Sequence, residues 1–482
     1  MFSPAITASL PLLITALTSV VVMIAIAIKR SHHAAAIITF VGFTASFVSL
    51  WPAFSAAPVP IASLLIVDHY ALVYMALVLA AGAAVVLLAF PYLERRSEHK
   101  EEFYLLLILA TLGSMVLTAA SHAVSLFLGI ELLSIALYAL VAYPRAESLP
   151  VEAGIKYLVL AASSSAFLLF GLALLYVDAG TMDFSRMAAR TPDLTGGFVP
   201  LAGTVMVLTG IGFKLAVVPF HLWTPDVYQG APLPVTAFIA TVSKGGVFAF
   251  LLRWLEMAGG ASPALLLVLA TVAIASMLAG NLLALRQTNI KRLLAYSSIA
   301  HMGYFFVAVI VGGALGRAAA TYYLICYIVT ILGAFGSLMA LSSGARDAET
   351  FEDVRGLFWR RPVLASVFTA MILSLAGIPL TAGFLGKFYV LATGASASAW
   401  TLIIVLIVSS TIGLVYYLRI IVAMFETAER GEPDRLEIAT ETPTVGLTLG
   451  VVLTVLTSAL LFLGVHPEPF WTTIRAATGA LD

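Results

Sequence analysis

The stretch LAGTVMVLTGIGFKLAVVPF occupies residues 201–220 and contains a single charged side chain, that of Lys214. An α-helix needs about 20 predominantly apolar residues to cross the hydrocarbon core of a bilayer. Pro219, near the end of the stretch, removes one intrahelical hydrogen bond. Such a break is tolerated in a membrane only inside protein or beside water. The stretch therefore predicts a membrane-spanning helix that carries a charge and is interrupted.

The composition of the whole chain extends this prediction. Of 482 residues, 61% are hydrophobic and 10% are charged, whereas soluble domains are about 45–50% apolar and about 25% charged. The formal net charge is zero, so no basic face for nucleic acid is expected. Cys326 is the one cysteine of the chain, which excludes a disulfide framework and an iron–sulfur cluster held by this chain alone. These features predict an integral membrane protein that crosses the bilayer many times.

Fourteen apolar runs long enough to span a membrane are predicted, and their continuity favours helices over a barrel. They lie near residues 8–28, 34–52, 70–90, 103–120, 123–143, 154–177, 199–220, 233–254, 263–285, 293–313, 318–342, 363–391, 399–424 and 445–466. The first run is not expected to be a cleaved signal, because Lys29 and Arg30 follow it. The longest polar segments, about 178–198, 343–361 and 426–443, are too short to bury a core of their own. The predicted fold class is an all-α polytopic membrane protein with about fourteen transmembrane helices.

The basic residues between the runs predict an orientation. In a fourteen-span arrangement, fifteen loop lysines and arginines fall on one side, and five, including Arg253 and Arg317, fall on the other. The excess of positive charge marks the cytoplasmic side. We therefore expect both termini to be periplasmic, in the inner membrane of a bacterium.

Four ionisable residues lie within apolar runs where no charge is expected: Glu131, Lys214, Lys244 and Lys387, the last of them nearer the end of a span. A charge at the bilayer centre costs about 2.5–3.5 kcal/mol even on the mildest scale. These side chains are therefore expected to face the interior of the bundle. They are either static buried ion pairs that set the register of the helices or groups that exchange protons with a neighbouring carboxylate or with water. One carboxylate among three lysines favours the proton relay.

Two runs are interrupted in the same way. Pro219 follows Lys214 in the seventh run, and Pro379 precedes Lys387 in the twelfth. Matching broken helices in two halves of a chain point to inverted repeats around a transport path. We predict two inverted five-helix units, spans 4–8 (residues 101–260) and spans 9–13 (residues 261–425). A three-helix segment (residues 1–100) precedes them, and a loop with span 14 (residues 426–482) follows.

Four further residues are candidates for the relay. Histidine can carry protons near neutral pH, and His301 lies inside the tenth run, while His221 follows the break in the seventh. A hydrogen-bonded core histidine is the alternative for both. Glu152 and Lys156 form an i,i+4 pair at the start of the sixth run, which is either a structural pair or a gate at the mouth of the relay.

At these residues the chain closely resembles the N-subunit family of bacterial NADH-quinone oxidoreductase, respiratory complex I, which is one of its antiporter-like membrane subunits. The resemblance covers nearly the whole chain, and HLWTPDVYQGAP and the Lys387 segment are specific to this subunit type. The matching stretches are LFLGIELLSIALYALVAY (126–143), EAGIKYLVLAASSSAFLLFG (152–171), FKLAVVPFHLWTPDVYQGAP (213–232), TAFIATVSK (236–244), NLLALRQTNIKRLLAYSSIAHMGY (281–304) and RGLFWRRPVLASVFTAMILSLAGIPLTAGFLGKFYVL (355–391).

The resemblance implies roles for the buried charges. Glu131 and Lys214 correspond to the carboxylate–lysine pair of a first half-channel, Lys244 to a central lysine, and Lys387 to the last group of a second half-channel. It also implies that this chain holds no cofactor or metal. FMN, iron–sulfur clusters and quinone are expected in partner subunits, and the expected neighbours are the antiporter-like subunit M, the small subunit K and membrane lipids.

The expected function is therefore proton translocation from cytoplasm to periplasm, driven by NADH oxidation and quinone reduction elsewhere in the complex. Three alternatives stay open. The chain could belong to a multisubunit cation/proton antiporter, it could be a spacer that carries no proton flux, or it could serve a hydrogenase-linked membrane complex.

Overall fold

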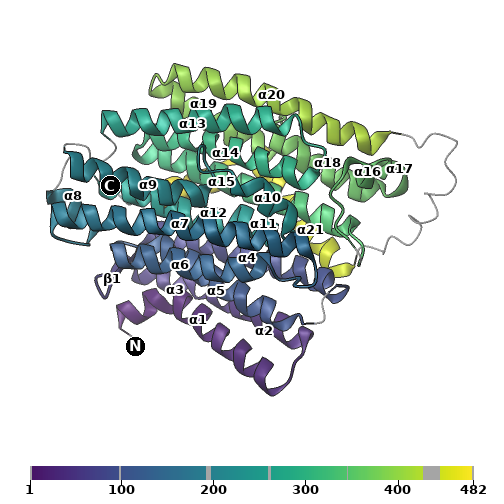
Figure 1. Cartoon of the computed structure of the whole chain (residues 1–482), viewed down its shortest axis with the longest axis horizontal. Helices are drawn as coiled ribbons and strands as arrows, with labels where there is room; N and C mark the ends of the chain where they lie inside the picture. Colours follow the sequence, from purple (N-terminus) through teal and green to yellow (C-terminus); the bar gives the residue numbers. More distant parts are fainter. Residues whose placement is uncertain are drawn as a thin grey trace.

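The helices of the computed structural model run roughly parallel to one another (Figure 1). The structure describes residues 3–96, 99–190, 197–258, 262–344, 346–426 and 446–479. The predicted polar segment 426–443 lies almost wholly outside the described residues, as does the predicted boundary between the two units at residues 260 and 261.

The N-terminal segment and the first predicted unit contain most of the short elements. They comprise α1 (Pro4–Ile28), α2 (His32–Val48), α3 (Leu50–Ala56), β1 (Val59–Ile61), β2 (Leu65–Val67), α4 (His69–Glu94), α5 (Glu101–Ala119), α6 (Ala123–Val141), α7 (Ser148–Ala179), α8 (Phe184–Arg190), α9 (Phe198–Leu215), α10 (Trp223–Gly230), α11 (Leu233–Phe238), η1 (Ile239–Ser243) and α12 (Lys244–Met257). The two strands form a small antiparallel hairpin in which Pro60 faces Ile66.

Among the described residues, the named elements of the second predicted unit and the C-terminal part are all helices. They comprise α13 (Pro263–Ala284), α14 (Ile290–Val311), α15 (Gly313–Leu341), α16 (Phe351–Val354), α17 (Leu357–Arg360), α18 (Pro362–Ala376), α19 (Ala382–Ser396), α20 (Trp400–Phe425), α21 (Leu447–Val465) and α22 (Glu468–Gly479).

The membrane-spanning helices confirm the predicted fold class. Thirteen helices of the described residues are long and apolar enough to cross a bilayer. The twelfth predicted run corresponds to α18 and α19, each 15 residues long, which is too short for either to span alone. Together they cross as one broken helix, which continues to Ser396 instead of ending near residue 391.

Both predicted breaks are present. Helix α9 ends at Leu215, and Ala216 adopts a left-handed conformation with φ +60°. Helix α18 ends at Ala376, where Gly377 has φ +85°. A side chain at Gly377 would be strained by this φ, because only glycine enters the left-handed region freely. Pro219 and Pro379 both lie in the connecting turns, where no intrahelical bond is required of them.

A third irregularity was not predicted. The eighth predicted run contains η1, one turn of π-helix, directly before Lys244. Such turns insert one extra residue into a helix and often occur at functional sites. Neither proline nor glycine marks this turn, so its sequence IATVS reads as an ordinary helix.

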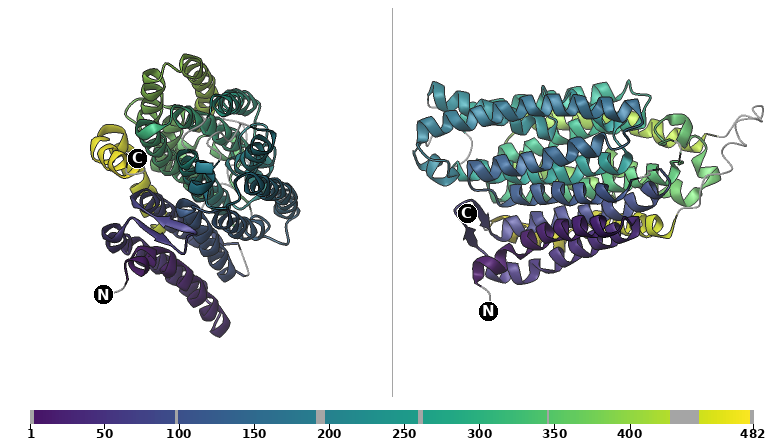
Figure 2. Two further views of the ribbon diagram at one scale, coloured as in Figure 1. Left: turned by 90° about the vertical axis from the view of Figure 1, so that its left-hand side faces the viewer. Right: turned by 60° about the horizontal axis from the view of Figure 1, so that its bottom comes forward.

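Burial divides the helices into a centre and a rim. The span formed by α11, η1 and α12 is buried on all sides, whereas α1, α2 and α7 expose much of their apolar surface. Seen end-on, the N-terminal helices α1 and α2 form a layer on one side of the main bundle (Figure 2). In a membrane protein, exposed apolar side chains of this kind face lipid or another subunit.

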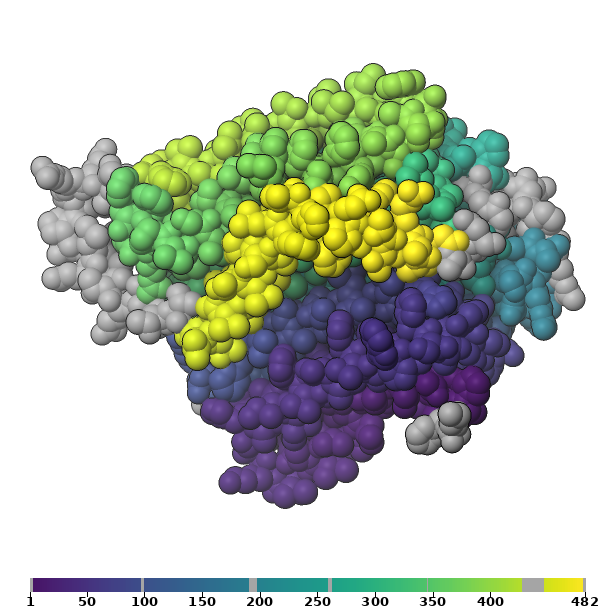
Figure 3. All heavy atoms as spheres, turned by 180° about the vertical axis from the view of Figure 1, so that it is seen from behind, coloured from purple at the N-terminus to yellow at the C-terminus, as the bar shows by residue number. Residues whose placement is uncertain are grey.

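The two ends of the bundle differ. Helices α16 and α17 lie at one end, and α8 and the β-hairpin lie at the other (Figure 1). Helices α21 and α22 run between the N-terminal helices and the second unit (Figure 3). The sequence did not predict α22, because its 12 residues include several polar ones. It is anchored by Trp471, whose ring stacks on Tyr389 with the ring centres 4.1 Å apart.

Candidate functional site

Lys214 lies one residue before the end of α9, at the break. Its side chain is 2% exposed, and its Nζ donates a hydrogen bond of 3.3 Å to the hydroxyl of Tyr157 on α7. The rings of Tyr138, Tyr157 and Phe213 surround the ammonium at 5.1–5.9 Å. Aromatic faces stabilise a cation in a low-dielectric site. The lysine is therefore held in an aromatic cage and has a single hydroxyl partner.

Glu131, on α6, does not form an ion pair with Lys214 among the described residues. Its Oε1 accepts a hydrogen bond of 2.5 Å from the Ser165 hydroxyl on α7. The residue is only half-buried, and Leu128 and Ile135 on the same face of α6 are 57% and 63% exposed. The carboxylate thus lies at the outer surface of this chain, within the span, and the lysine lies deeper.

The pair Glu152–Lys156 is present, at 2.8 Å, and belongs to a larger cluster. Lys156 also pairs with Asp226 on α10 at 2.9 Å, and Asp226 pairs with Arg292 on α14 at 2.7 Å. Asp226 therefore links the first predicted unit to the second. The sequence analysis did not select Asp226. Its position in the first turn of the helix after the break could have indicated it, because acidic residues are enriched there.

This cluster connects mechanically to the cage of Lys214. Asp226 lies one turn after Trp223 on α10, and the Trp223 indole donates a hydrogen bond of 3.0 Å to the carbonyl oxygen of Phe213, the residue before Lys214. The Trp223 ring also packs on Tyr157, with the ring centres 4.8 Å apart. A displacement of α10 would therefore move both walls of the cage.

Lys244 is fully buried at the point where η1 joins α12. Its Nζ donates a hydrogen bond of 2.6 Å to the Ser298 hydroxyl on α14. The Tyr327 hydroxyl on α15 donates to the same Ser298 oxygen, at 2.7 Å. Because α12, α14 and α15 meet here, this lysine lies where the two predicted units join.

His301 lies one turn after Ser298 on α14 and is also buried. Its Nε2 is 3.2 Å from the hydroxyl of Tyr417, and its Nδ1 is 2.8 Å from the hydroxyl of Tyr323. The Tyr417 hydroxyl also contacts the Ser297 hydroxyl. Both ring nitrogens therefore have hydroxyl partners, as either a proton carrier or a satisfied core histidine would.

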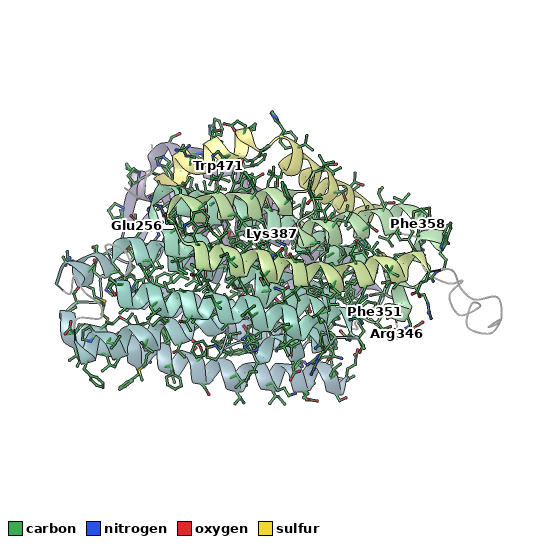
Figure 4. The ribbon with its side chains drawn as sticks, turned by 90° about the horizontal axis from the view of Figure 1, so that it is seen from above. Glu256, Arg346, Phe351, Phe358, Lys387 and Trp471 are labelled. Carbon is green, nitrogen blue, oxygen red and sulfur yellow. The ribbon has the colours of Figure 1, made fainter. Side chains whose placement is uncertain are left out.

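Lys387 lies in the middle of the molecule, between Glu256 at one end and Phe358 at the other (Figure 4). The break places its helix α19 in the second half of a longer crossing. Its Nζ donates to the carbonyl oxygens of Leu375 and Ala376, at 2.9 and 3.0 Å, and to the Ser410 hydroxyl at 2.9 Å. A cation there satisfies carbonyls that the end of α18 leaves unpaired.

Hydroxyl and amide groups lie between His301 and Lys387. The ring of Tyr304 faces the Lys387 ammonium at 5.3 Å. Its hydroxyl accepts hydrogen bonds from the Asn281 amide at 2.8 Å and from the Ser409 hydroxyl at 3.3 Å. The buried polar groups of α13, α14 and α20 thus form a local network around the second break.

His221 lies beside the first break. It lies in the turn after the α9 break and is largely buried, and its Nδ1 has no hydrogen-bond partner among the described residues. No hydrogen bond joins it to Lys214 in the part of the chain that the structure describes. Its place in the relay stays a prediction.

Two arginines assigned to outer loops are in fact buried ion-pair partners. Arg253 on α12 donates to both carboxylate oxygens of Asp68, at 2.7 and 2.8 Å. Arg317 on α15 pairs with Glu256 and donates to the carbonyl oxygen of Thr478 on α22. Their burial was not predicted, because both residues lie near the ends of spans, and sequence cannot show that neighbouring helices cover them.

A loop near the other end of the bundle carries a third buried pair. Lys291, which is 2% exposed, pairs with Asp347 at 3.0 Å, and Arg96 contacts the same carboxylate. Burial alone would raise the pKa of Asp347, but the charges of Lys291 and Arg96 outweigh it and lower that pKa below its ordinary value.

In the described residues, no three His, Cys, Asp or Glu side chains lie together in a way that could hold a metal ion. The buried lysines instead alternate with hydroxyl groups and with one imidazole. Such groups can accept and donate protons in turn.

Comparisons with known proteins show the family of this chain. Residues 120–413 match the family model described as NADH:quinone oxidoreductase/Mrp antiporter, TM. A protein of Ectopseudomonas mendocina (strain ymp), named NADH-quinone oxidoreductase subunit N, is 47% identical over 98% of this chain and 96% of its own.

Solved structures show the same fold. A chain of respiratory complex I from Thermus thermophilus superposes with a TM-score of 0.79 at 32% identity, over 96% of this chain and 98% of that one. A chain of the archaeal membrane-bound sulfane sulfur reductase gives 0.85 at 25% identity, over 99% and 98%. A chain of the Mrp complex from Dietzia sp. DQ12-45-1b gives 0.85 at 20% identity, over 100% and 98%, which shows the fold alone.

The two broken spans and the line of buried lysines thus define an antiporter-like, multi-pass membrane subunit. Within that class, the chain belongs to the family of NADH-quinone oxidoreductase N subunits. Members of this family are parts of an enzyme complex, so the expected partners are other subunits of complex I.

Proposed function

We propose that this chain is a non-redox subunit of a proton-translocating NADH-quinone oxidoreductase and moves protons from the cytoplasm to the periplasm. Glu131, Lys214, Lys244 and Lys387 are the groups that carry or control the protons. The redox chemistry, with FMN, iron–sulfur clusters and quinone, takes place in partner subunits.

One contrast carries the proposal. The buried bases near the ends of spans are neutralised by carboxylates: Arg253 by Asp68, Arg317 by Glu256 and Lys291 by Asp347. Lys214, Lys244 and Lys387 have only hydroxyl or carbonyl partners among the described residues. A permanently charged buried base without a counter-ion is costly. Three such lysines in one protein favour groups that can give up the proton, and a static spacer would pair them.

The order of the groups suggests the path. Protons would reach Lys214 past the Asp226 cluster and pass through water to Lys244, because no hydrogen bond in the described residues joins the Tyr157 hydroxyl to the Lys244 partners. From Ser298 the next group along α14 is His301, and Lys387 follows beyond Tyr304. Glu131 would regulate the protonation of Lys214, because the charge of its carboxylate acts on the lysine although the two side chains do not touch.

The position of Glu131 also suggests how a neighbouring subunit could regulate proton transfer in this chain. A half-buried carboxylate flanked by exposed apolar residues is suited to sensing a neighbouring membrane subunit. We propose subunits K and M as the neighbours, in a bacterial inner membrane with both termini in the periplasm. This orientation would place the Asp226 cluster and α16 at the cytoplasmic side.

The test is NADH-driven acidification of inverted membrane vesicles that carry Lys214→Met. We expect acidification per NADH to fall at least several-fold while the complex still assembles. Lys29→Met is the matched control, because Lys29 is an exposed lysine after the end of α1. Normal acidification per NADH in the assembled Lys214→Met complex would contradict the proposal and support the spacer.

A further inference from the structure

A cavity of about 220 Å³ lies directly behind the break that follows Lys214. Its wall is formed by α9, by the turn that contains Pro219 and Phe220, and by residues of α12, α13 and α14. It therefore lies between the first predicted unit and the second. The polar path described above does not use it.

The chemistry of the wall defines the ligand class. Every lining side chain is apolar except that of Thr209, whose hydroxyl donates to the carbonyl oxygen of Val205 at 2.9 Å and is thus satisfied. Apolar cavities of about 150 Å³ stay free of water and bind small apolar molecules. This cavity is larger and offers no partner to water or to a charged headgroup.

The cavity is lined by exposed side chains on the flanks of two long helices. Val205 on α9 and Val268 on α13 line it and are 45% and 42% exposed. Both belong to helices that are long and apolar enough to span a membrane, so this opening faces the hydrocarbon of the bilayer wherever no neighbouring subunit covers it. The apolar molecule that this medium supplies is the acyl chain of a phospholipid.

We propose that this cavity binds one phospholipid acyl chain. The headgroup stays outside, because no free polar side chain lines the cavity. The chain contacts Pro219 and Phe220, and the Phe220 ring packs so closely on α9 that a Cβ at Gly212 would lie 2.9 Å from it. The lipid thus supports the break that positions Lys214.

The experiment uses the whole complex in nanodiscs that contain a phosphatidylcholine with a diazirine at the end of one acyl chain. After irradiation, mass spectrometry locates the labelled residues. We expect labelling around Val205, Phe220 and Val268 to be at least threefold higher than at Ile404, Ile407 and Val408, which are more exposed apolar residues of α20. Equal labelling of the two groups would show bulk lipid only and overturn the proposal.

A blocking variant sharpens the result. Val268→Trp should close the opening and reduce labelling around Phe220 at least threefold, whereas Val408→Trp on α20 should leave it unchanged. Undiminished labelling around Phe220 in Val268→Trp would contradict the proposal, and so would label found on a neighbouring subunit at this face. The measurement on the unmodified protein decides the question even if the variant does not assemble.

Discussion

Lys387 donates a hydrogen bond to the carbonyl oxygen of Ala376, the last residue of α18, across the break in the twelfth predicted span. The lysine therefore has two tasks. It is a buried base on the proposed path, and it caps the helix half that ends in front of it. A substitution there changes both the charge of the path and the geometry of the break.

Replacing this lysine should affect pumping and stability together. In Lys387→Met, the Leu375, Ala376 and Ser410 oxygens lose their donor, and a hydrogen bond to a charged group contributes about 1.5–3 kcal/mol. We expect acidification per NADH to fall at least several-fold, and the assembled complex to dissociate at a lower temperature. Retention of both properties would show that neither task is required, and Lys29→Met again serves as the control.

The turn before Lys387 provides a test of the break alone. Gly377 has φ +85°, and an added Cβ would lie 2.9 Å from Cδ of Lys387. We expect Gly377→Ala to destabilise the protein by about 1–3 kcal/mol and to reduce pumping by displacing the lysine. Gly446→Ala is the control, because a Cβ there meets no atom of the described residues within 4 Å. Equal thermal stability of the two variants would contradict this account.

Ser298 should be required for the central step. It accepts hydrogen bonds from both Lys244 and Tyr327, so Ser298→Ala leaves the lysine without a hydroxyl partner. We expect proton pumping to fall about tenfold, which corresponds to about 1.4 kcal/mol in a barrier. Thr411→Ala is matched to it, because that hydroxyl is exposed and bonds only to its own helix. Pumping at the normal rate in assembled Ser298→Ala complex would remove Ser298 from the path.

Asp226 should influence pumping more than stability. Its two ion pairs are partly exposed, and pairs of this kind contribute about 0.2–1 kcal/mol each. Through Trp223, however, α10 is tied to the residue before Lys214. We expect Asp226→Asn to reduce acidification per NADH with little change in thermal stability. In a double-mutant cycle with Lys156→Met, the reductions in acidification caused by the two substitutions should be non-additive. Simple additivity would show that the Lys156–Asp226 contact does not cause the effect on pumping.

The loop carboxylate Asp347 should contribute to stability in a pH-dependent way. Because its pKa is lowered in the folded protein, its contribution is fully present above the ordinary pKa of an aspartate. The contribution is lost as the pH falls through the lowered value. Asp347→Asn leaves Lys291 buried without a counter-ion, at a cost of about 3–5 kcal/mol. The gap in melting temperature between the two proteins should therefore be wide at pH 7 and narrow toward pH 3, and a constant gap would exclude this linkage.

The sequence was sufficient for the spans, the two main breaks and the burial of Lys214, Lys244 and Lys387. Each rests on a local rule: the length of an apolar run, the missing hydrogen bond of Pro219, or the cost of a charge such as Lys244 in hydrocarbon. The π-turn before Lys244 was not predicted, because its residues are the same types that occur in an ordinary helix. Helix α22 was not predicted, because it is short and amphipathic instead of apolar.

By itself, then, the sequence determined that this is a polytopic helical protein and that Glu131, Lys214, Lys244 and Lys387 lie within its apolar runs. Only the tertiary structure decided which partner each charge has: Ser298 for Lys244, the end of α18 for Lys387, and Asp68 for Arg253. The physical reason is that hydrogen bonds and ion pairs depend on how helices distant in sequence are rotated and packed against each other. Hydropathy measures the tendency of a segment to leave water, and it holds no information on the direction in which a side chain points.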